Sequence, residues 1–481
     1  MVPATQFLSI GQLDNKTNHH KRLSMSSGGH DQLKSDDQYP SCQPVPDQPL
    51  KSLQCPTLPR MIVLMTTSGT RIATQRRTAV EQLAPVLTDA NPVLGVMDFN
   101  VLDQLIEHLR DVYTEDWLTH TVAVNTISLP GVLEHFRARG LGVQTASAAE
   151  LEIAENSGYS LTDVVHNAPV KTQAHLRDIT DAELSFSIDN FAELTRVDQL
   201  LSDPQSYAGA VGIRVTPQAS ADDDATTLAH MGIGLRDHRD ELIQAFVDRP
   251  WLTQLHVSFD TPPTTLQQAA EQVAAAYQFA EDIEHAAGGQ RIFRLHFPAV
   301  IPVNVTSDEV QPTFDNHRFV HQAMMPELFD GKYDVVSEIS VPLTAKAGMI
   351  LARVEYTKDL DDRMIAVVHA GAQQCPHTTR VLAYDSDGRY KDDLQHYYYD
   401  IAGPTGLVAQ RVELPELEEG DVVAILDVGA TAFGFGSAFT APVYGIRADG
   451  LLTESSILNA GWSVTDLAKA VGIYQPTKLL H

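Results

Sequence analysis

The sequence predicts an α/β protein, a TIM (β/α)8 barrel followed by an antiparallel β domain. From about residue 90 to about residue 340, short apolar segments alternate with amphipathic helical patterns at intervals of roughly 20–40 residues. Such an alternation is typical of a parallel βα array, and eight units close a barrel. After Gly348 the pattern changes to strands separated by turn residues, which favours a separate β domain.

The barrel is expected to cover residues 100–348. The helix after its first strand should begin at Pro130 and stop at Gly140, because proline is tolerated in a first helical turn and glycine ends helices. Ser147 and Glu150 have the spacing of a capping box, which predicts the start of the next helix. The eight expected strands are residues 121–124, 141–146, 163–168, 184–189, 208–215, 252–259, 291–297 and 333–339.

The segments on either side of the barrel differ from it in composition. Residues 1–84 are expected to be a disordered or linker tail, because the first 60 are rich in Ser, Gln, Asp, Pro and His and show no periodicity. The β domain is expected to combine residues 85–99 with residues 349–481. Its clearest strand patterns are residues 349–359, 363–371, 378–385, 406–414 and 420–429.

Charge and cysteine content narrow the classes of function. Lys plus Arg total 34 and Asp plus Glu total 62, which gives a net charge of −28. So acidic a chain repels phosphate backbones and anionic lipid, which argues against a nucleic-acid partner and a membrane partner. Cys42, Cys55 and Cys375 form neither a disulfide framework nor a zinc-site spacing. A reducing, cytoplasmic setting is therefore expected.

Several ordered motifs from about residue 91 to about residue 445 carry a resemblance to a known family. They are NPVLGVMDFNVLDQ, VAVNTISLPGVL, ASAAEL, NAPVKT, GIRVTP, SEISVPLTAKAGMILARVEYTK and LPELEEGDVVAILDVGATAFGFGSAF. In this order they resemble the fold-type-III pyridoxal-phosphate decarboxylases, namely the diaminopimelate, ornithine and arginine decarboxylases, whose relatives include alanine racemase. The resemblance implies the same barrel followed by a β domain, and a homodimer, because the related enzymes build their sites across the subunit interface.

The residues that hold pyridoxal phosphate in this family are changed here. The resemblance places Asn125 at the Schiff-base lysine, and an amide cannot form a Schiff base. At the family's glycine-rich phosphate turn, residues 298–300 read Pro-Ala-Val, which removes one amide donor and adds bulk. Ser258, Val341, Gly406 and Thr431 fall at the ring-stacking histidine, a motif arginine, the cysteine of the Gly-Pro-x-Cys motif and a phosphate-contacting tyrosine. No covalently held cofactor is therefore expected, unless Lys171 or Lys346 supplies the amine.

Polar residues near the C-terminal strand ends are the candidates for a ligand site, because these ends converge on one mouth of a TIM barrel. The candidates are Asn125, His166, Arg214, Ser258, His296, Glu338 and Thr431. Glu338 retains the carboxylate that faces the pyridine nitrogen in the family, either as a ligand contact or as an inherited residue. Arg214 could bind an anion or form a structural ion pair, and Asn125 could contact a ligand or only fill space.

A divalent metal is a second interpretation of the same positions. His166, His256 and His296, with a carboxylate, could hold a metal that acts as a Lewis acid. The alternative is that these histidines are satisfied polar residues that lie near strand ends by chance.

Three functions stay open on this evidence. The favoured one is a decarboxylase homologue that has lost covalent pyridoxal phosphate chemistry. Such a pseudoenzyme would bind a small amino-acid-like or polyamine-like ligand, or would regulate a true decarboxylase by forming a heterodimer with it. The second is an amino-acid decarboxylase with altered or metal-based chemistry. The third is an unrelated reaction on a reused barrel.

Overall fold

A computed structural model gives the fold of this protein. It describes residues 58–201, 206–217, 231–259, 263, 265–309, 313–360, 363–371, 380–392, 395–406, 408–430, 432–437, 439–449 and 452–470. Most of the expected tail, the acidic run at residues 222–224 and the candidate Thr431 lie outside these residues.

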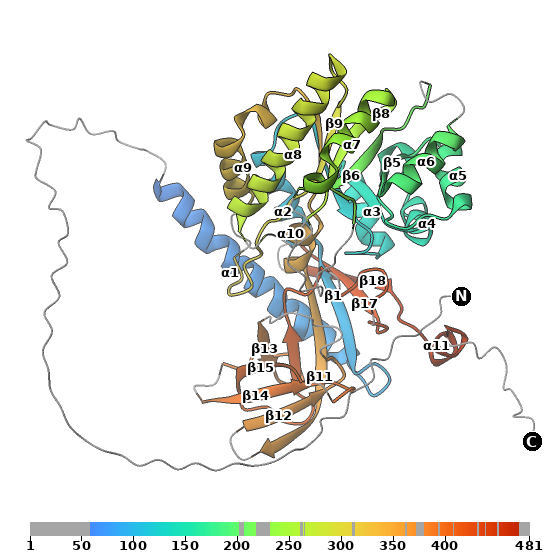
Figure 1. The fold of residues 1–481 in the computed structure, drawn as a ribbon. Coiled ribbons are helices and arrows are strands. Elements are labelled where there is room, and N and C mark those ends of the chain that lie inside the picture. The colour runs from blue at the N-terminus through green and yellow to red at the C-terminus, as the bar shows by residue number, and fades with distance from the viewer. Residues whose placement is uncertain are drawn as a thin grey trace, which may run out of the picture. The chain divides into compact units, whose positions relative to one another are not determined.

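Eight parallel strands close a barrel, which confirms the fold class (Figure 1). Each strand is hydrogen-bonded to two neighbours, and the pairing of β5 with β6 completes the ring. All eight coincide with strands expected from the sequence; a two-residue strand, β7 (Ile233–Gly234), pairs beside β6. The barrel strands are β2 (Leu118–Ala123), β3 (Gly142–Thr145), β4 (Val164–His166), β5 (Ser185–Ile188), β6 (Val211–Thr216), β8 (Leu252–Val257), β9 (Arg294–Pro298) and β10 (Asp334–Glu338).

Helices surround the barrel, and their ends follow from local sequence signals. In the capping box at the start of the fourth helix, the Glu150 amide donates to Ser147 Oγ at 3.2 Å, and Glu150 Oε2 accepts from the Ala146 amide at 2.9 Å. Gly288 ends the eighth helix in the left-handed conformation, with φ at +71°. The helices from α2 onward are α2 (Phe99–Val112), α3 (Pro130–Ala138), α4 (Ala148–Asn156), α5 (Gln173–Asp181), α6 (Phe191–Leu200), α7 (Leu235–Asp248), α8 (Leu266–Ala287), α9 (Thr313–Met324), α10 (Ser340–Thr344) and α11 (Val464–Ala470), with short 3-10 turns at Ala84–Val86, Leu161–Asp163, Pro326–Phe329 and Ala345–Ala347.

The barrel wall separates an apolar outer face from a polar interior. Strand β6 shows this alternation: Val211, Ile213 and Val215 are buried in the apolar core, whereas Gly212 and Arg214 fall on the other face. Gly212 lies against Gln254 of β8, and Arg214 bonds to residues of neighbouring strands. TIM barrels usually fill the interior with branched apolar residues, so this polar filling is a distinguishing feature.

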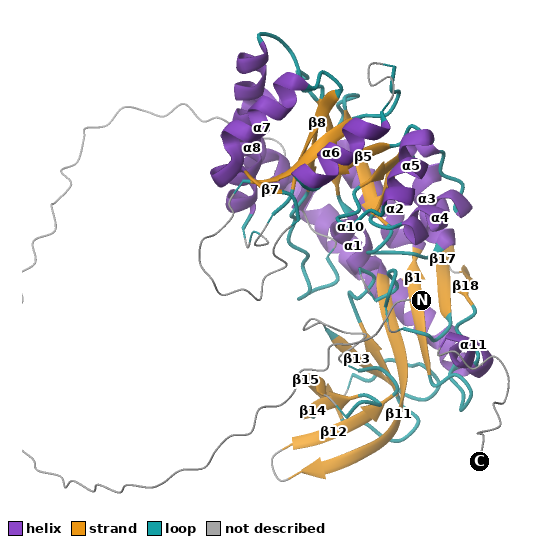
Figure 2. Ribbon diagram, turned by 45° about the vertical axis from the view of Figure 1, so that its right-hand side comes forward, coloured by secondary structure: helices purple, strands orange, loops and turns teal. Residues whose placement is uncertain are grey.

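The expected β domain is a separate mixed sheet, in which six of the described strand pairings are antiparallel and two are parallel. β1 (Val93–Asp98) precedes the barrel in sequence, pairs antiparallel with β11 (Gly348–Leu360) and runs parallel to β17 (Val443–Asp449). A second parallel pairing joins β12 to β14. The other strands of the sheet are β12 (Arg363–Val368), β13 (Val381–Tyr384), β14 (His396–Ala402), β15 (Val408–Pro415), β16 (Val422–Ile425) and β18 (Leu452–Asn459) (Figure 2).

Residues 58–83, which the sequence places in the tail, form a helix, α1 (Leu58–Leu83). Its C-terminal half buries Ile72, Ala79, Val80 and Leu83. Ile72 lies seven and eight residues before Ala79 and Val80, and Leu83 follows them by four and three, so all four share one face of the helix. Ala79, Val80 and Leu83 share a core cluster with buried residues of β1, β11 and β16. The burial of this apolar stripe explains why the segment is helical despite its polar composition.

Arg76 of α1 enters a cluster of charges that joins separate parts of the chain. It forms an ion pair with Asp308, and its Nη2 lies 3.8 Å from Asp427 Oδ1. Arg380 lies 2.7 Å from Asp308 and 3.5 Å from Asp427, and Lys346 Nζ lies 3.5 Å from Asp427. Three cations thus surround the carboxylates of Asp308 and Asp427. The side chain of Asp427 is fully buried.

The close approach of β6 to β8 gives a test of barrel packing. A Cβ at residue 212 would lie 2.4 Å from the carbonyl oxygen of Gln254, so Gly212→Ala should lower the free energy of unfolding by about 1–3 kcal/mol. Urea unfolding measures the change. In the control, Gly289→Ala, the new methyl group meets no atom within 4 Å. Equal unfolding midpoints for the two variants would show that β6 and β8 are not packed this closely.

Candidate functional site

The polar interior of the barrel is a connected hydrogen-bond network. Ser187 Oγ donates to Asn167 Oδ1 at 2.8 Å, and Asn167 Nδ2 donates to Gln144 Oε1 at 2.9 Å. Gln144 Nε2 donates to Thr121 Oγ1 at 2.9 Å and lies 2.7 Å from Nε2 of His296. All these groups are buried, and each bond offsets the cost of removing a polar atom from water.

His256 and His296 lie at the centre of this network and stack on each other. Their ring centroids are 4.1 Å apart and the rings are 8° from parallel. His256 Nδ1 lies 3.0 Å from Ser187 Oγ and accepts from Arg214 Nε at 3.4 Å. Burial lowers the pKa of His256 well below its usual value, and burial with the charges of Arg214 and Arg294 lowers the pKa of His296 to about 3. Both rings are therefore neutral at neutral pH.

Arg214 takes part in a buried ion pair. Its Nη1 lies 2.9 Å from Asp189 Oδ1, and Nη2 donates to the carbonyl oxygen of Asn167. Only 4% of Arg214 is exposed, and Asp189 is also buried. Of the two interpretations open for Arg214, the geometry agrees with the structural pair.

Glu338 ends β10 at the C-terminal side of the barrel. Its Oε1 accepts from the Ser340 amide at 3.2 Å and from the Ser340 hydroxyl, whose oxygen in turn accepts from the Ala123 amide at 2.7 Å. No ion pair to Glu338 occurs among the described residues. Burial raises the pKa of this carboxyl, and the bonds to Ser340 offset the rise only in part. A cationic group brought next to Glu338 would therefore gain an unpaired partner.

His166 lies outside the barrel mouth. Its Nδ1 is 2.8 Å from Thr145 Oγ1, and its ring meets that of His175 on helix α5 edge-on at 4.8 Å. The next residue, Asn167, belongs to the interior network, so strand alternation turns His166 toward the helices. The three histidines suggested as metal ligands are thus not brought together. The described residues contain no group of three or more His, Cys, Asp or Glu side chains that could hold a metal ion.

Asn125 follows β2 and is exposed. Its Oδ1 accepts from the Thr126 hydroxyl at 3.3 Å, and its carbonyl oxygen would be 2.1 Å from a Cβ at Gly434. Ser258 is half-buried after β8, and its amide donates to the Val215 carbonyl at 2.8 Å. Gly406 lies in an exposed turn with φ at +72°, which glycine adopts without strain.

The three lysines of the barrel domain are all engaged with other groups. Lys171 Nζ lies 2.6 Å from Glu193 Oε1 and donates to two carbonyl oxygens. Lys346 Nζ donates to the Ser307 carbonyl at 2.6 Å and belongs to the charge cluster around Asp427. Lys332, which precedes β10, pairs with Glu281 and Glu284. None of the three offers a free amine at the C-terminal end of the barrel.

The segment at the family's phosphate turn is not a cradle of free amides. Pro298 has no N–H, and the amide of Ala299 donates to the Glu338 carbonyl at 2.8 Å. Together with the lysine contacts, this donor set does not fit covalently bound pyridoxal phosphate.

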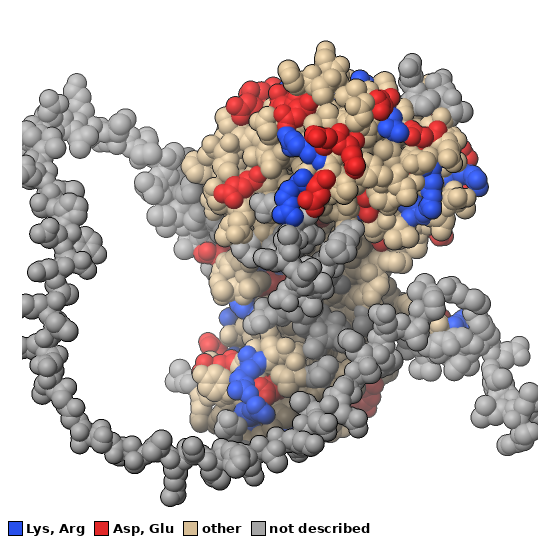
Figure 3. Space-filling view, in the orientation of Figure 1, with Lys and Arg blue, Asp and Glu red and all other residues tan. Residues whose placement is uncertain are grey.

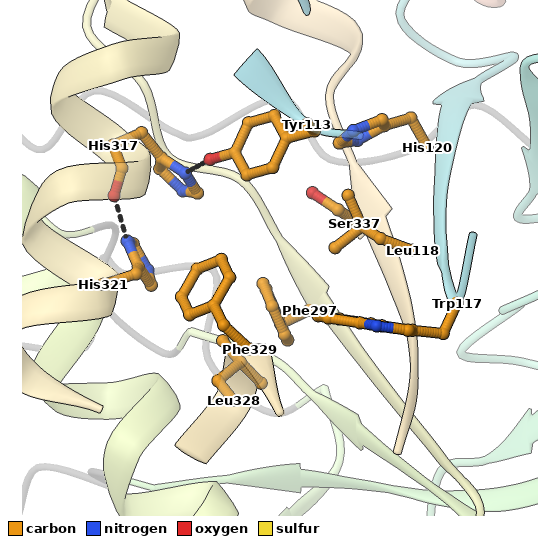
Figure 4. A pocket seen from close by; sticks show the side chains of 10 residues that line it. All are labelled: Tyr113, Trp117, Leu118, His120, Phe297, His317, His321, Leu328, Phe329 and Ser337. Carbon is orange, nitrogen blue, oxygen red and sulfur yellow. Dashed lines mark hydrogen bonds between the residues drawn. The ribbon is translucent and has the colours of Figure 1, made fainter. Parts of the chain in front are cut away.

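A small, mainly apolar hollow that contains three histidines lies outside the barrel interior, between the barrel wall and helix α9 (Figure 4). Tyr113 Oη lies 2.6 Å from His317 Nδ1, and His321 Nδ1 donates to the His317 carbonyl at 2.8 Å. Both ring nitrogens of His120 and Nε2 of His317 are buried without a partner among the described residues. Burial lowers the pKa of His120 to about 4. The sequence signal for this cluster is the His-x-x-x-His spacing of residues 317 and 321, which puts both side chains on one face of a helix. The prediction of site residues missed it, because it considered only residues near strand ends.

The surface charges are mixed in sign. In Figure 3, acidic and basic side chains intermingle on the visible face of the barrel, and the described residues there form no continuous basic surface. Among the described helices, none is both long enough and apolar enough to cross a membrane.

The neutral state of the stacked histidines predicts a dependence of stability on pH. An unfolded histidine has a pKa near about 6.5, whereas folded His296 has a pKa of about 3. Unfolding therefore takes up a proton between these values, and stability falls as pH drops from about 6.5 toward 3. The slope from this group is at most about 1.4 kcal/mol per pH unit.

Urea unfolding between pH 5 and pH 8 measures this slope. His296→Gln removes the one proton that His296 takes up on unfolding, so it should reduce the slope by up to about 1.4 kcal/mol per pH unit. At pH 8 His296 is neutral in both the folded and the unfolded chain. The difference in unfolding free energy between the variant and the unaltered protein at pH 8 therefore measures the change in packing alone. An unchanged slope below pH 6.5 would mean that His296 is not held neutral by the fold.

Comparisons with known proteins agree with the fold and the motifs. Residues 103–282 match the model of the pyridoxal binding domain of pyridoxal-dependent decarboxylases. Diaminopimelate decarboxylase of Pseudomonas aeruginosa is 25% identical over 334 residues, 66% of this chain and 77% of that protein. Diaminopimelate decarboxylase of Aquifex aeolicus is 20% identical over 358 residues, 72% of this chain and 83% of that one.

A solved structure shares the fold. The diaminopimelate decarboxylase of M. jannaschii in complex with L-lysine superposes with a TM-score of 0.68 and 17% identity, over 83% of this chain and 95% of that one. The matched domain model, the sequence relatives and the shared fold agree that this chain is similar to the pyridoxal-dependent decarboxylases of fold type III.

Proposed function

We propose that this protein is a decarboxylase homologue without covalent pyridoxal phosphate chemistry, which binds a small amino-acid-like or polyamine-like ligand or regulates a related decarboxylase. One observation carries the proposal: Asn125 follows β2, and each lysine of the barrel is held by other groups. Schiff-base formation needs an unprotonated amine that can reach the aldehyde.

The contacts of Lys171 and Lys346 support this proposal. Lys171 is 7% exposed and Lys346 is 4% exposed. Freeing either amine would break an ion pair with a buried carboxylate and leave Glu193 or Asp427 with fewer partners. Losing one partner of a buried pair costs about 3–5 kcal/mol, so neither lysine is a suitable replacement.

Glu338 supports a ligand that carries an ammonium group. Glu338 is half-buried, its hydrogen-bond partner is the neutral Ser340, and desolvation raises the pKa of its carboxyl. An ammonium group of an amino acid or polyamine would favour the charged form of this carboxyl and gain a charge-assisted hydrogen bond. The solved relative is in complex with L-lysine. L-lysine is the kind of molecule that the site around Glu338 would accept.

The regulatory part of the proposal concerns assembly. We place the protein in a reducing, cytoplasmic compartment, as a homodimer or as a heterodimer with an intact decarboxylase. In such a heterodimer the chain would act through the shared interface and would supply no amine of its own.

A decarboxylase with altered chemistry is the second candidate. The observation that favours it is the pair of neutral imidazoles, His256 and His296, because a neutral imidazole can accept a proton. Release of CO2 from diaminopimelate, lysine or ornithine by the purified protein, lost in His256→Gln, would establish this function.

Incubation with pyridoxal phosphate tests the first proposal. After borohydride reduction, mass spectrometry of peptides should find no stoichiometric adduct on Lys171, Lys332 or Lys346. The variant Asn125→Lys should gain a visible absorbance band and a reducible adduct at residue 125, because an amine then follows β2. The control Asn156→Lys places a lysine at an exposed position of helix α4. A stoichiometric adduct on a barrel lysine of the unaltered protein would refute the proposal.

Ligand-induced stabilisation tests the role of Glu338. L-lysine or cadaverine should raise the melting temperature of the unaltered protein, because both carry an ammonium group. Glu338→Gln keeps the shape of the side chain but removes its charge, so it should lose most of this shift. An equal shift in both proteins would place the amine site elsewhere.

A further inference from the structure

A hollow of about 370 Å³ lies beside the end of β2, outside the barrel interior. Its walls come from the turn after β2, the loop that leads to β17, and the segment after β18. The residues that line it are Ser128, Leu129, Phe433, Gly434, Phe435, Gly436, Ser437, Phe439, Val443, Asn459 and Trp462. Its position and chemistry differ from those of the mouth around Glu338.

Glycines create this hollow. Gly434 lies directly against the Asn125 carbonyl, where a Cβ would be 2.1 Å from the oxygen. Gly436 and Gly461 have φ angles of +82° and +78°, which most side chains rarely adopt. The loop also bonds to the turn after β2, because the Ser128 amide donates to the Phe433 carbonyl at 3.1 Å. These contacts hold the described part of the loop against the turn after β2.

Four aromatic rings supply most of the apolar surface. Phe433 is 4% exposed and meets Phe439 edge-on at 5.3 Å, so these two rings form the fixed floor. Phe435 and Trp462 are 45% and 51% exposed and stand at the rim. Single exposed aromatic residues are ordinary, but two at the rim of one aromatic-floored hollow give a planar ring surfaces on which to stack.

The lining of the hollow also favours an uncharged ligand. None of its residues is ionisable, although the chain carries a net charge of −28. A charged molecule would lose hydration here without gaining an ion pair, which disfavours amino acids and phosphates. The Ser128 hydroxyl already donates to the Phe433 carbonyl at 3.1 Å, and the Ser437 hydroxyl donates to the Ala432 carbonyl. The Ser437 oxygen also accepts from the Phe439 amide at 3.1 Å, so Ser128 Oγ is the better placed acceptor for an N–H or O–H of a ligand.

We propose that this hollow binds a small, neutral, planar aromatic molecule that carries one N–H or O–H group, of the indole or phenol type. The size and the mainly apolar lining with a few polar groups are those of small-molecule sites. The site goes beyond the proposed function, because it concerns a second ligand class in a hollow next to the amine site.

Isothermal titration calorimetry of the full-length protein with indole tests the assignment. Indole should bind, and indole-3-acetate, which carries the same ring and a charge, should bind at least about tenfold more weakly. Phe435→Ala should weaken indole binding by about tenfold through loss of a stacking surface. The matched control is Phe319→Ala, which removes a 71%-exposed phenylalanine on α9 and should leave binding unchanged.

Three outcomes would overturn the assignment. They are no indole binding, equal binding to the unaltered protein and Phe435→Ala, and equal binding of indole and indole-3-acetate. Light scattering on the same samples adds a fourth. If Phe435→Ala halves the mass in solution, the hollow is a subunit interface instead of a ligand site. None of these results bears on pyridoxal phosphate adducts, so the proposed function is tested separately.

Discussion

The requirement that every polar group inside a closed barrel find a hydrogen-bond partner governs much of this structure. Once Gln144, Asn167 and Ser187 face inward, each must be satisfied by a neighbour on another strand, and the network from Thr121 to His296 does so. The same network holds His256 and His296 stacked and uncharged. Rearranging one member would leave others unpaired, so the interior behaves as a unit.

This constraint distinguishes the barrel interior, whose polar groups bond to one another, from the C-terminal end of the barrel, where a ligand could bind. Arg214 is paired with Asp189, and the stacked histidines are bonded to the network. Glu338 stands apart, because its carboxyl meets only a neutral hydroxyl and an amide. Glu338 is thus the half-buried carboxyl at this end of the barrel that has no cationic partner among the described residues.

The fold could be predicted from the sequence because strand length, apolar pattern and motif order all point to the same architecture. The site could be predicted only in part. His166 was placed at the mouth from its nearness to a strand end, but successive residues of a strand face opposite sides, and Asn167 takes the inward position. Helix α1 was missed because its buried stripe is short within a polar segment. The parallel pairing of β1 with β17 joins segments more than 340 residues apart, which no local pattern reveals.

The contacts of α1 bear on how this protein can be divided into pieces. A fragment that starts where the family motifs start, near residue 91, would lack Arg76 and the apolar stripe that covers β1, β11 and β16. Asp308 would lose one of its two cationic partners, and Asp427, whose side chain is fully buried, would lose one of three. Boundaries drawn from alignment alone would therefore yield a less soluble and more weakly folded product, and the N-terminal helix belongs to the smallest self-sufficient unit.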